Sequence, residues 1–225
     1  MKNFYLILSC CALFSLTAHS ENFSGDDFNG AWESDGGNQK VQPVGWHALS
    51  CNASGVFGSM KGGTVTKGGD ESDASPIIEN IFAGSKGSWM TTGYVIPGIL
   101  SLGTPWIYVD TNYFTAAKGD LGVDGGVEFT GRPSKITFKA QYYNAPTSDI
   151  DDAAHIKVYL WKGSAESTDI SGANHTDEMS AVLAGNAGAT LIGSGELTID
   201  NDIDAFEAKD CLLYTSPSPR DGLLS

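Results

Sequence analysis

Two segments in the second half of the chain alternate apolar and polar residues with a period of two. Within residues 135–143 the apolar positions are Ile136, Phe138, Ala140 and Tyr142. Within residues 155–161 the apolar face carries Ile156, Val158 and Leu160, and the other face carries His155, Lys157, Tyr159 and Trp161. This alternation predicts antiparallel strands with one buried and one solvent-facing side.

The rest of the chain is also typical of short strands joined by loops. Clusters of Gly, Asp, Asn, Ser and Pro separate the apolar runs, which indicates turns. Further strands are expected at 56–60, 63–66, 77–82, 89–96, 107–110, 126–129 and 190–199. A two-turn loop helix is expected at 177–184. The pattern predicts an all-β fold, as a sandwich or jelly roll.

The N-terminus has the plan of a secretory signal peptide. Lys2 supplies a positive charge, residues 4–16 form a short and mostly apolar run, and Ala18 and Ser20 are small residues suited to cleavage after Ser20. Export follows, to the periplasm, the cell surface or the medium. Cys10 and Cys11 leave a lipoprotein signal as the less favoured alternative. No later stretch approaches the ~20 apolar residues of a membrane span.

The C-terminus differs in character from the acidic segment before it. Residues 211–221 read CLLYTSPSPRD, the peptide that one reading frame of a common transposase sequencing adapter encodes. We therefore expect 211–225 to be a non-native tail and 21–210 to be one domain, with strands missing beyond Asp210. A flexible Pro/Ser tail is the alternative interpretation.

Charge narrows the classes of partner. The formal net charge is −14, from 13 Lys and Arg against 27 Asp and Glu. Such a balance repels phosphate backbones, so nucleic acid is a poor partner, whereas neutral glycans, cations and basic proteins remain open. With both ends set aside Cys51 is the one remaining cysteine, expected as a small buried residue.

Several motifs resemble a known family. The segments Phe28-Asn29-Gly30-Ala31-Trp32 and Pro43-Val44-Gly45-Trp46, and above all residues 125–136 (GGVEFTGRPSKI), are similar to the PCMD family of exported Bacteroidetes proteins, whose name refers to carbohydrate metabolism. The resemblance covers most of residues 29–207. It implies a jelly-roll sandwich similar to carbohydrate-binding modules, and it implies no catalytic residues.

Aromatic residues are the first candidates for a ligand site, because sugars stack their C–H faces on flat apolar rings. Trp161 has the strongest claim, with Tyr159 on the same polar face, and Trp106 follows; Trp46 and Trp89 are weaker candidates. The alternative for each tryptophan is packing. Arg132 could donate paired hydrogen bonds to a carboxylate or to sugar hydroxyls, or it could hold the turn before the next strand.

Acidic residues are the second group of candidates. Asp149, Asp151 and Asp152 could supply oxygen ligands to Ca²⁺, and the alternative is a solvated acidic turn. Catalysis has no specific signal, since 27 acids will place some pair at a glycosidase spacing by chance. The sequence therefore favours a non-catalytic glycan-binding module over a protein-binding surface module and over a glycan-active hydrolase.

Overall fold

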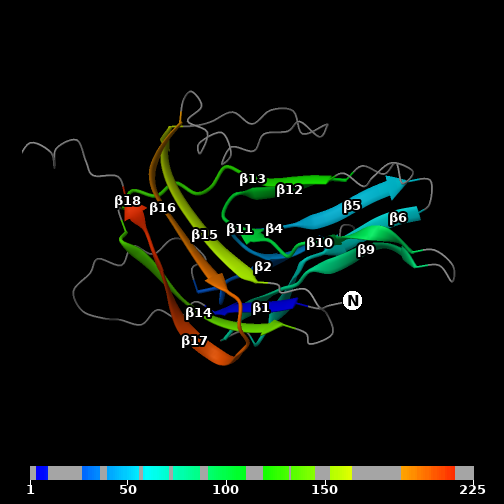
Figure 1. Ribbon diagram of the computed structural model, residues 1–225, viewed down its shortest axis with the longest axis horizontal. Helices are drawn as coiled ribbons and strands as arrows, with labels where there is room; N and C mark the ends of the chain where they lie inside the picture. The colour runs from blue at the N-terminus through cyan, green and yellow to red at the C-terminus, as the bar shows by residue number, and fades with distance from the viewer. Residues whose placement is uncertain are drawn as a thin grey trace, which may run out of the picture.

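The computed structural model describes residues 4–9, 27–35, 40–55, 58–70, 73–86, 91–109, 119–131, 133–144, 153–163 and 189–215. These residues form strands, turns and loops without a helix, so the fold is all-β (Figure 1). The strands are β1 (Phe4–Ser9), β2 (Trp32–Asp35), β3 (Lys40–Pro43), β4 (His47–Ala48), β5 (Ser50–Gly55), β6 (Gly58–Gly63), β7 (Val65–Gly68), β8 (Ser75–Ile78), β9 (Ile81–Lys86), β10 (Thr91–Ile96), β11 (Leu100–Ser101), β12 (Thr104–Val109), β13 (Gly119–Asp124), β14 (Lys135–Asn144), β15 (Ala154–Gly163), β16 (Ala189–Ile199), β17 (Ile203–Leu212) and β18 (Tyr214–Thr215).

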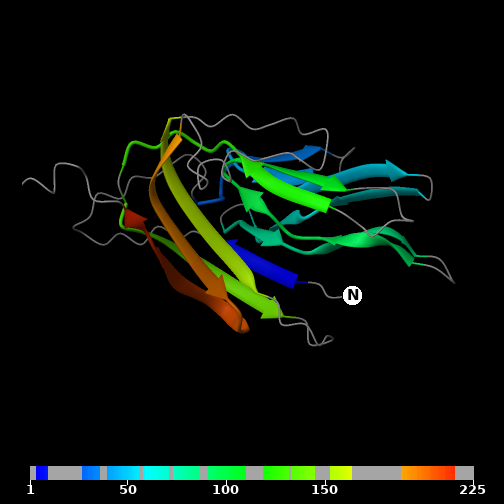
Figure 2. The same cartoon turned by 45° about the horizontal axis from the view of Figure 1, so that its top comes forward.

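The two larger sheets contain the long strands β14, β15, β16 and β17, which lie on one side of the molecule. One sheet has five strands in the order β17-β14-β1-β8-β7, and another has three in the order β15-β16-β18. The long β15–β16 pair curves across β14 and β17 (Figures 1 and 2). Two-stranded pairings, among them β5–β6, β9–β10 and β12–β13, extend from the opposite side of the molecule.

A hydrophobic cluster lies between β14–β17 and β15–β16. Phe138, Ala140 and Tyr142 of β14 are almost fully buried, as the alternation predicts. Ile156 and Val158 of β15 pack against this cluster, which confirms the inward positions predicted for these two residues. The cluster is completed by Ile136, Ala154, Leu197, Ile199, Ile203 and Cys211. Strands β14, β15, β16 and β17 therefore contribute apolar side chains to one hydrophobic cluster.

A glycine allows β16 and β17 to approach closely. A Cβ atom at Gly195 of β16 would collide with the carbonyl oxygen of Leu212 and lie 3.1 Å from Sγ of Cys211. Burial raises the pKa of the Cys211 thiol, and the nearby Glu196 carboxylate raises it further. The Cys211 side chain therefore remains a protonated thiol within the core.

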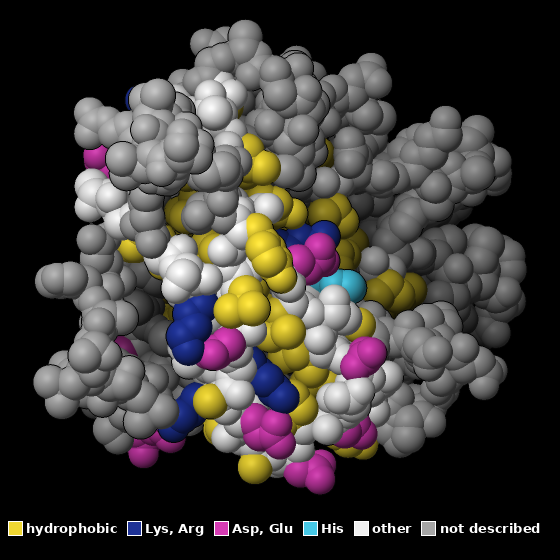
Figure 3. Space-filling view, turned by 60° about the vertical axis from the view of Figure 1, so that its left-hand side comes forward, with side chains coloured by type: hydrophobic (Ala, Val, Ile, Leu, Met, Phe, Trp, Pro, Cys, Tyr) yellow, Lys and Arg dark blue, Asp and Glu magenta, His cyan; other side chains and the backbone are white. Residues whose placement is uncertain are grey.

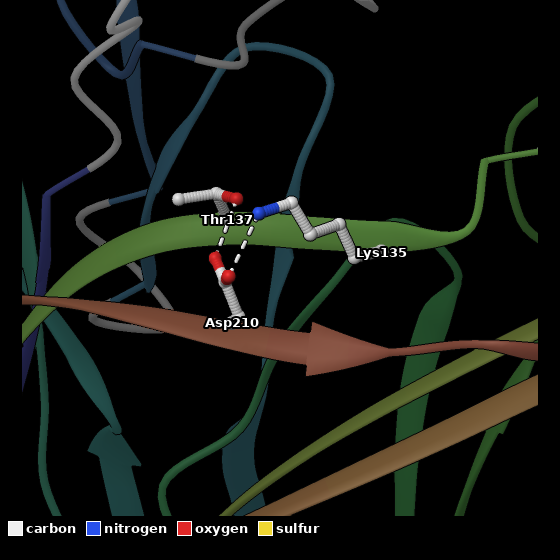
Figure 4. Close-up of polar contacts among 3 residues, drawn as sticks. All are labelled: Lys135, Thr137 and Asp210. Carbon is white, nitrogen blue, oxygen red and sulfur yellow. Dashed lines mark hydrogen bonds and ion pairs between the residues drawn. The ribbon is translucent and has the colours of Figure 1, made fainter. Parts of the chain in front are cut away.

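A polar contact joins β14 to β17 on the outward face of their sheet. Asp210 accepts hydrogen bonds from Lys135 Nζ at 2.8 Å and from Thr137 Oγ1 at 2.7 Å (Figure 4). The hydrogen bond from Lys135 is the main cause of a lowered pKa for the Asp210 carboxyl, and that from Thr137 adds to it. Because Thr137 and Asp210 face each other directly in the ladder, the contact marks the register of the two strands.

A second cluster lies among the hairpins and contains the buried Leu49, Cys51 and Ile96. Thr64 bonds to three other segments: its amide and hydroxyl both donate to Leu49 O, its carbonyl accepts from Glu79 N, and its hydroxyl accepts from Ile99 N. The Thr64 side chain is 1% exposed, so these bonds satisfy polar groups that water cannot reach. Burial of Cys51 agrees with its expected role.

The two N-terminal motifs come together around the β2–β3 hairpin. The ring of Phe28 is buried and lies 5.2 Å from that of Trp46, centroid to centroid. Trp32 Nε1 donates to Phe28 O, and Val44 N donates to Ala31 O. Gly45 has a φ of 87°, a conformation that glycine adopts without steric cost. Trp46 is thus a packing residue.

Four expected strands differ from the structure, and one of them, 63–66, is interrupted at Thr64 between the end of β6 and the start of β7. Residues 126–129 are a loop, since Gly125 adopts a φ of 72° directly after β13. The expected strand 77–82 is split into β8 and β9, because Glu79 N bonds Thr64 O and the Asn80 side chain accepts from Gly98 N. The expected strand 56–60 falls on the junction of β5 and β6, and residues 56–57 lie outside the described residues, as does the expected helix 177–184.

Candidate functional site

The outward side of β15–β16 carries a row of polar side chains beside an aromatic ring. Antiparallel pairing sets three outward pairs side by side along the two strands: His155 with Thr198, Lys157 with Glu196, and Tyr159 with Ser194. We call these six residues the polar ladder. The inward residues between them face the core, so the ladder is the solvent-facing side of this sheet.

Contacts within the ladder are short. His155 Nδ1 lies 3.2 Å from Thr198 Oγ1 and 3.4 Å from a carboxylate oxygen of Glu196. Lys157 Nζ lies 3.6 Å from the same oxygen. The side chains of His155, Lys157 and Glu196 are all about half exposed, so these contacts are weak and easily exchanged for other hydrogen-bond partners.

Trp161 continues the row at the end of β15, but it is not open to solvent. A register shift between Leu160 and Trp161 places Trp161 opposite Leu191, and Trp161, Ala189 and Leu191 are all partly buried apolar side chains of one cluster. The far edge of the indole lies 3.3 Å from the position that a Cβ atom of Gly126 would occupy. Trp161 is therefore half-buried beneath the loop that follows β13, with Tyr159 two residues away on the same face.

Of the other expected ligand residues, Trp106 is among those described and lies away from this row. Trp106 lies on β12, opposite Gly122 of β13, and belongs to a different sheet. Arg132 lies outside the described residues. Trp89 is also outside the described part of the chain.

The proposed calcium ligands cannot be placed. Asp149, Asp151 and Asp152 all lie in residues 145–152, outside the described residues. Within the described ranges no group of three or more His, Cys, Asp and Glu side chains is arranged to hold a metal ion. The calcium site stays a prediction.

Sequence reasoning missed Glu196 and Thr198 as members of the row. Both belong to the expected strand 190–199, but the sequence does not indicate which strand pairs with it. The alternation of 155–161 identifies which residues face outward, whereas the identity of their neighbours depends on pairing across 25 residues of connecting chain.

Comparison of the chain with protein-family models, with curated proteins and with solved structures found no match. Among the described residues no helix has the length and apolar character needed to cross a bilayer.

Proposed function

We propose that this chain is an exported glycan-binding module, similar to jelly-roll carbohydrate-binding modules, that recognises a polysaccharide without covalent chemistry. The observation that carries the proposal is the row formed by the polar ladder and Trp161. An aromatic ring on a solvent-facing strand, flanked by hydrogen-bonding groups of both kinds, has the composition that sugar recognition needs.

Within this row Tyr159 offers the ring on which a pyranose stacks. Lys157 Nζ donates to hydroxyl oxygens, while the Glu196 carboxylate accepts from hydroxyl groups. The half-exposed geometry supports this assignment, because the Lys157–Glu196 ion pair can be exchanged for sugar contacts at small cost. Trp161, half-buried beneath the Gly126 loop, supports the end of β15 beside Tyr159.

A glycan array probed with the full chain tests the proposal, followed by calorimetry on any polysaccharide that binds. Tyr159→Ala is expected to remove about 0.5–1.5 kcal/mol of binding free energy, up to about tenfold in Kd. Tyr143→Ala is the matched control, since Tyr143 is 45% exposed on β14 and outside the row. Absence of binding to every glycan, or equal losses in both variants, would contradict the proposal.

Two additions to the same experiment address the calcium site and the hydrolase alternative. If Asp149, Asp151 and Asp152 hold Ca²⁺ that supports the binding loops, EDTA weakens glycan binding and added Ca²⁺ restores it. Chromatography of the bound glycan after prolonged incubation shows whether it has been shortened. Shortened products would replace the binding module with a hydrolase.

A protein-binding surface module is the second candidate, and one observation favours it. Exposed hydrophobic side chains gather among lysines and acids on the side of the molecule where β16, β17 and β18 lie (Figure 3). Phe206 of β17 is 41% exposed. A contiguous exposed apolar patch is typical of protein contacts. Loss of partner binding in Phe206→Ser, with glycan binding intact, would support this candidate.

A further inference from the structure

Strand β1 occupies the centre of the five-stranded sheet. Its six residues pair antiparallel with β14, from Phe4 opposite Asn144 to Ser9 opposite Lys139. Leu6 and Ile7 also pair antiparallel with Ile78 and Ile77 of β8. In Figures 1 and 2 β1 runs alongside β14. The sheet order makes β1 the link between β17–β14 on one side and β8–β7 on the other.

Export would remove these same residues from the mature chain. Phe4–Ser9 falls within the segment expected to be removed after Ser20, and a strand that has been removed cannot join β14 to β8 in the mature chain. Its loss would strip β14 of ladder partners along 139–144, where Ala140 and Tyr142 are buried. Backbone groups at such positions require partners.

Without β1, strands β14 and β8 cannot easily pair with each other directly. Both β14 and β8 are antiparallel to β1, so they run parallel to each other, two strand spacings or about 10 Å apart. Closing that distance would move β14 together with β17 and the core packed on them. The new pair would also be parallel, with a different hydrogen-bond pattern from the one the two strands present to β1.

We propose that the position between residues 139–144 of β14 and Ile77–Ile78 of β8, here called the strand site, binds an extended apolar segment of a second polypeptide after the leader is removed. The chain's own Phe4–Ser9 shows what the site takes. That occupant is six residues long, antiparallel to both neighbours, and rich in large apolar residues (FYLILS). Addition of a strand from another chain is an established mode of peptide recognition.

The register defines the chemistry of the incoming strand. Residues at the positions of Leu6 and Leu8 stand opposite the buried Tyr142 and Ala140, so apolar side chains are required there. The position of Ile7 stands opposite Gln141 and tolerates a polar residue. This inference depends on the export part of the proposed function and is independent of glycan binding.

The test uses the full chain with a specific protease site inserted after Ser20, folded and then cut. We expect residues 1–20 to remain bound during size-exclusion chromatography and to exchange with a fluorescent peptide of residues 2–9. A peptide with Leu6→Pro should bind roughly tenfold more weakly or worse, because proline removes a ladder donor. A cut chain that loses the leader, unfolds at lower temperature and is restored by the peptide also supports the strand site.

Other outcomes overturn the proposal. A cut chain that loses the leader, binds no peptide and keeps the unfolding temperature of the uncut chain has no strand site. A lowered unfolding temperature that the peptide does not restore has the same meaning. In the uncut chain Ile7→Pro should lower the unfolding temperature while Lys2→Pro, outside β1, should not; equal effects would show that Phe4–Ser9 is not a strand of the sheet.

N-terminal sequencing of the exported chain separates this inference from the proposed function. An N-terminus at Glu21 leaves the strand site open for a second polypeptide. An exported chain that retains Phe4–Ser9 overturns the second-polypeptide occupant. Glycan binding, measured on the same preparation, can fail without changing either result.

Discussion

Lys135 donates a hydrogen bond of 2.8 Å to the carboxylate of Asp210 and thereby joins the start of β14 to the end of β17. Thr137 donates to the other carboxylate oxygen at 2.7 Å. Both bonds need the ionised carboxylate as acceptor, which is why the pKa of Asp210 lies below its ordinary value of 3.8.

The Asp210 contacts predict a pH-dependent contribution to stability. A carboxyl whose pKa is lower in the folded state stabilises the fold above its unfolded pKa, and this contribution is lost as the pH falls through the folded pKa. Asp210→Asn should therefore lower the unfolding temperature at pH 7 and have little effect well below pH 3.8. Thermal unfolding at both pH values measures the difference. Asp200→Asn, an exposed acid in the connection from β16 to β17, is the control.

Gly195 should tolerate no side chain. A methyl group there would collide with the Leu212 carbonyl and crowd Sγ of Cys211, so β16 and β17 would have to separate. Gly195→Ala should destabilise the fold by about 1–3 kcal/mol, as overpacking does in other cores. Urea unfolding gives the value. Gly30→Ala is the matched control, because a Cβ at Gly30 meets no heavy atom within 4 Å. Equal losses would mean that the two strands do not approach closely.

The buried hydroxyl of Thr64 gives a third prediction. Thr64→Val keeps the shape of the side chain but removes the donor to Leu49 O at 2.8 Å and the acceptor for Ile99 N at 3.4 Å. Because the site is buried, the lost partners should cost about 1–3 kcal/mol of unfolding free energy. Thr66→Val, an exposed position on β7, should change stability by less than about 0.5 kcal/mol. Urea unfolding of both variants measures the two changes in unfolding free energy.

Sequence alone could predict the faces of strands but not their neighbours. The alternation in β14 identifies Phe138, Ala140 and Tyr142 as core residues because burial acts on each residue locally. The pairing of Lys157 with Glu196 depends on a long connection, and local pattern carries no information about it.

Some features were ambiguous because two structures have the same local requirements. The apolar run at 4–9 satisfies a leader peptide and a central strand equally well, since both need apolar side chains without breakers. The expected strand at 126–129 failed for a different reason. The positive φ of Gly125 turns the chain out of the β13 ladder, and Gly126 then lies against Trp161.

The end of the described chain gives the last prediction. Cys211 is 1% exposed and Leu213 is 7% exposed, whereas Leu212 and Tyr214 between and beyond them are 55% and 76% exposed. Leu213 N also donates to Ser134 O. The fold therefore uses inward apolar residues at two alternate positions after Asp210. A chain ending at Asp210 should unfold at a lower temperature than the full chain, while one ending at Thr215 keeps every described contact and should not.

The same positions test the expected foreign origin of residues 211–225. If an adapter replaced the natural sequence after Asp210, we expect the natural gene to encode a segment that fills the same two inward positions. The core residues of β14 and β16 that contact these positions would be unchanged. We expect apolar residues at 211 and 213 and polar residues between them in that gene. Sequencing across the junction checks this. Polar residues at both inward positions would show that the natural strand does not follow the path of residues 211–213.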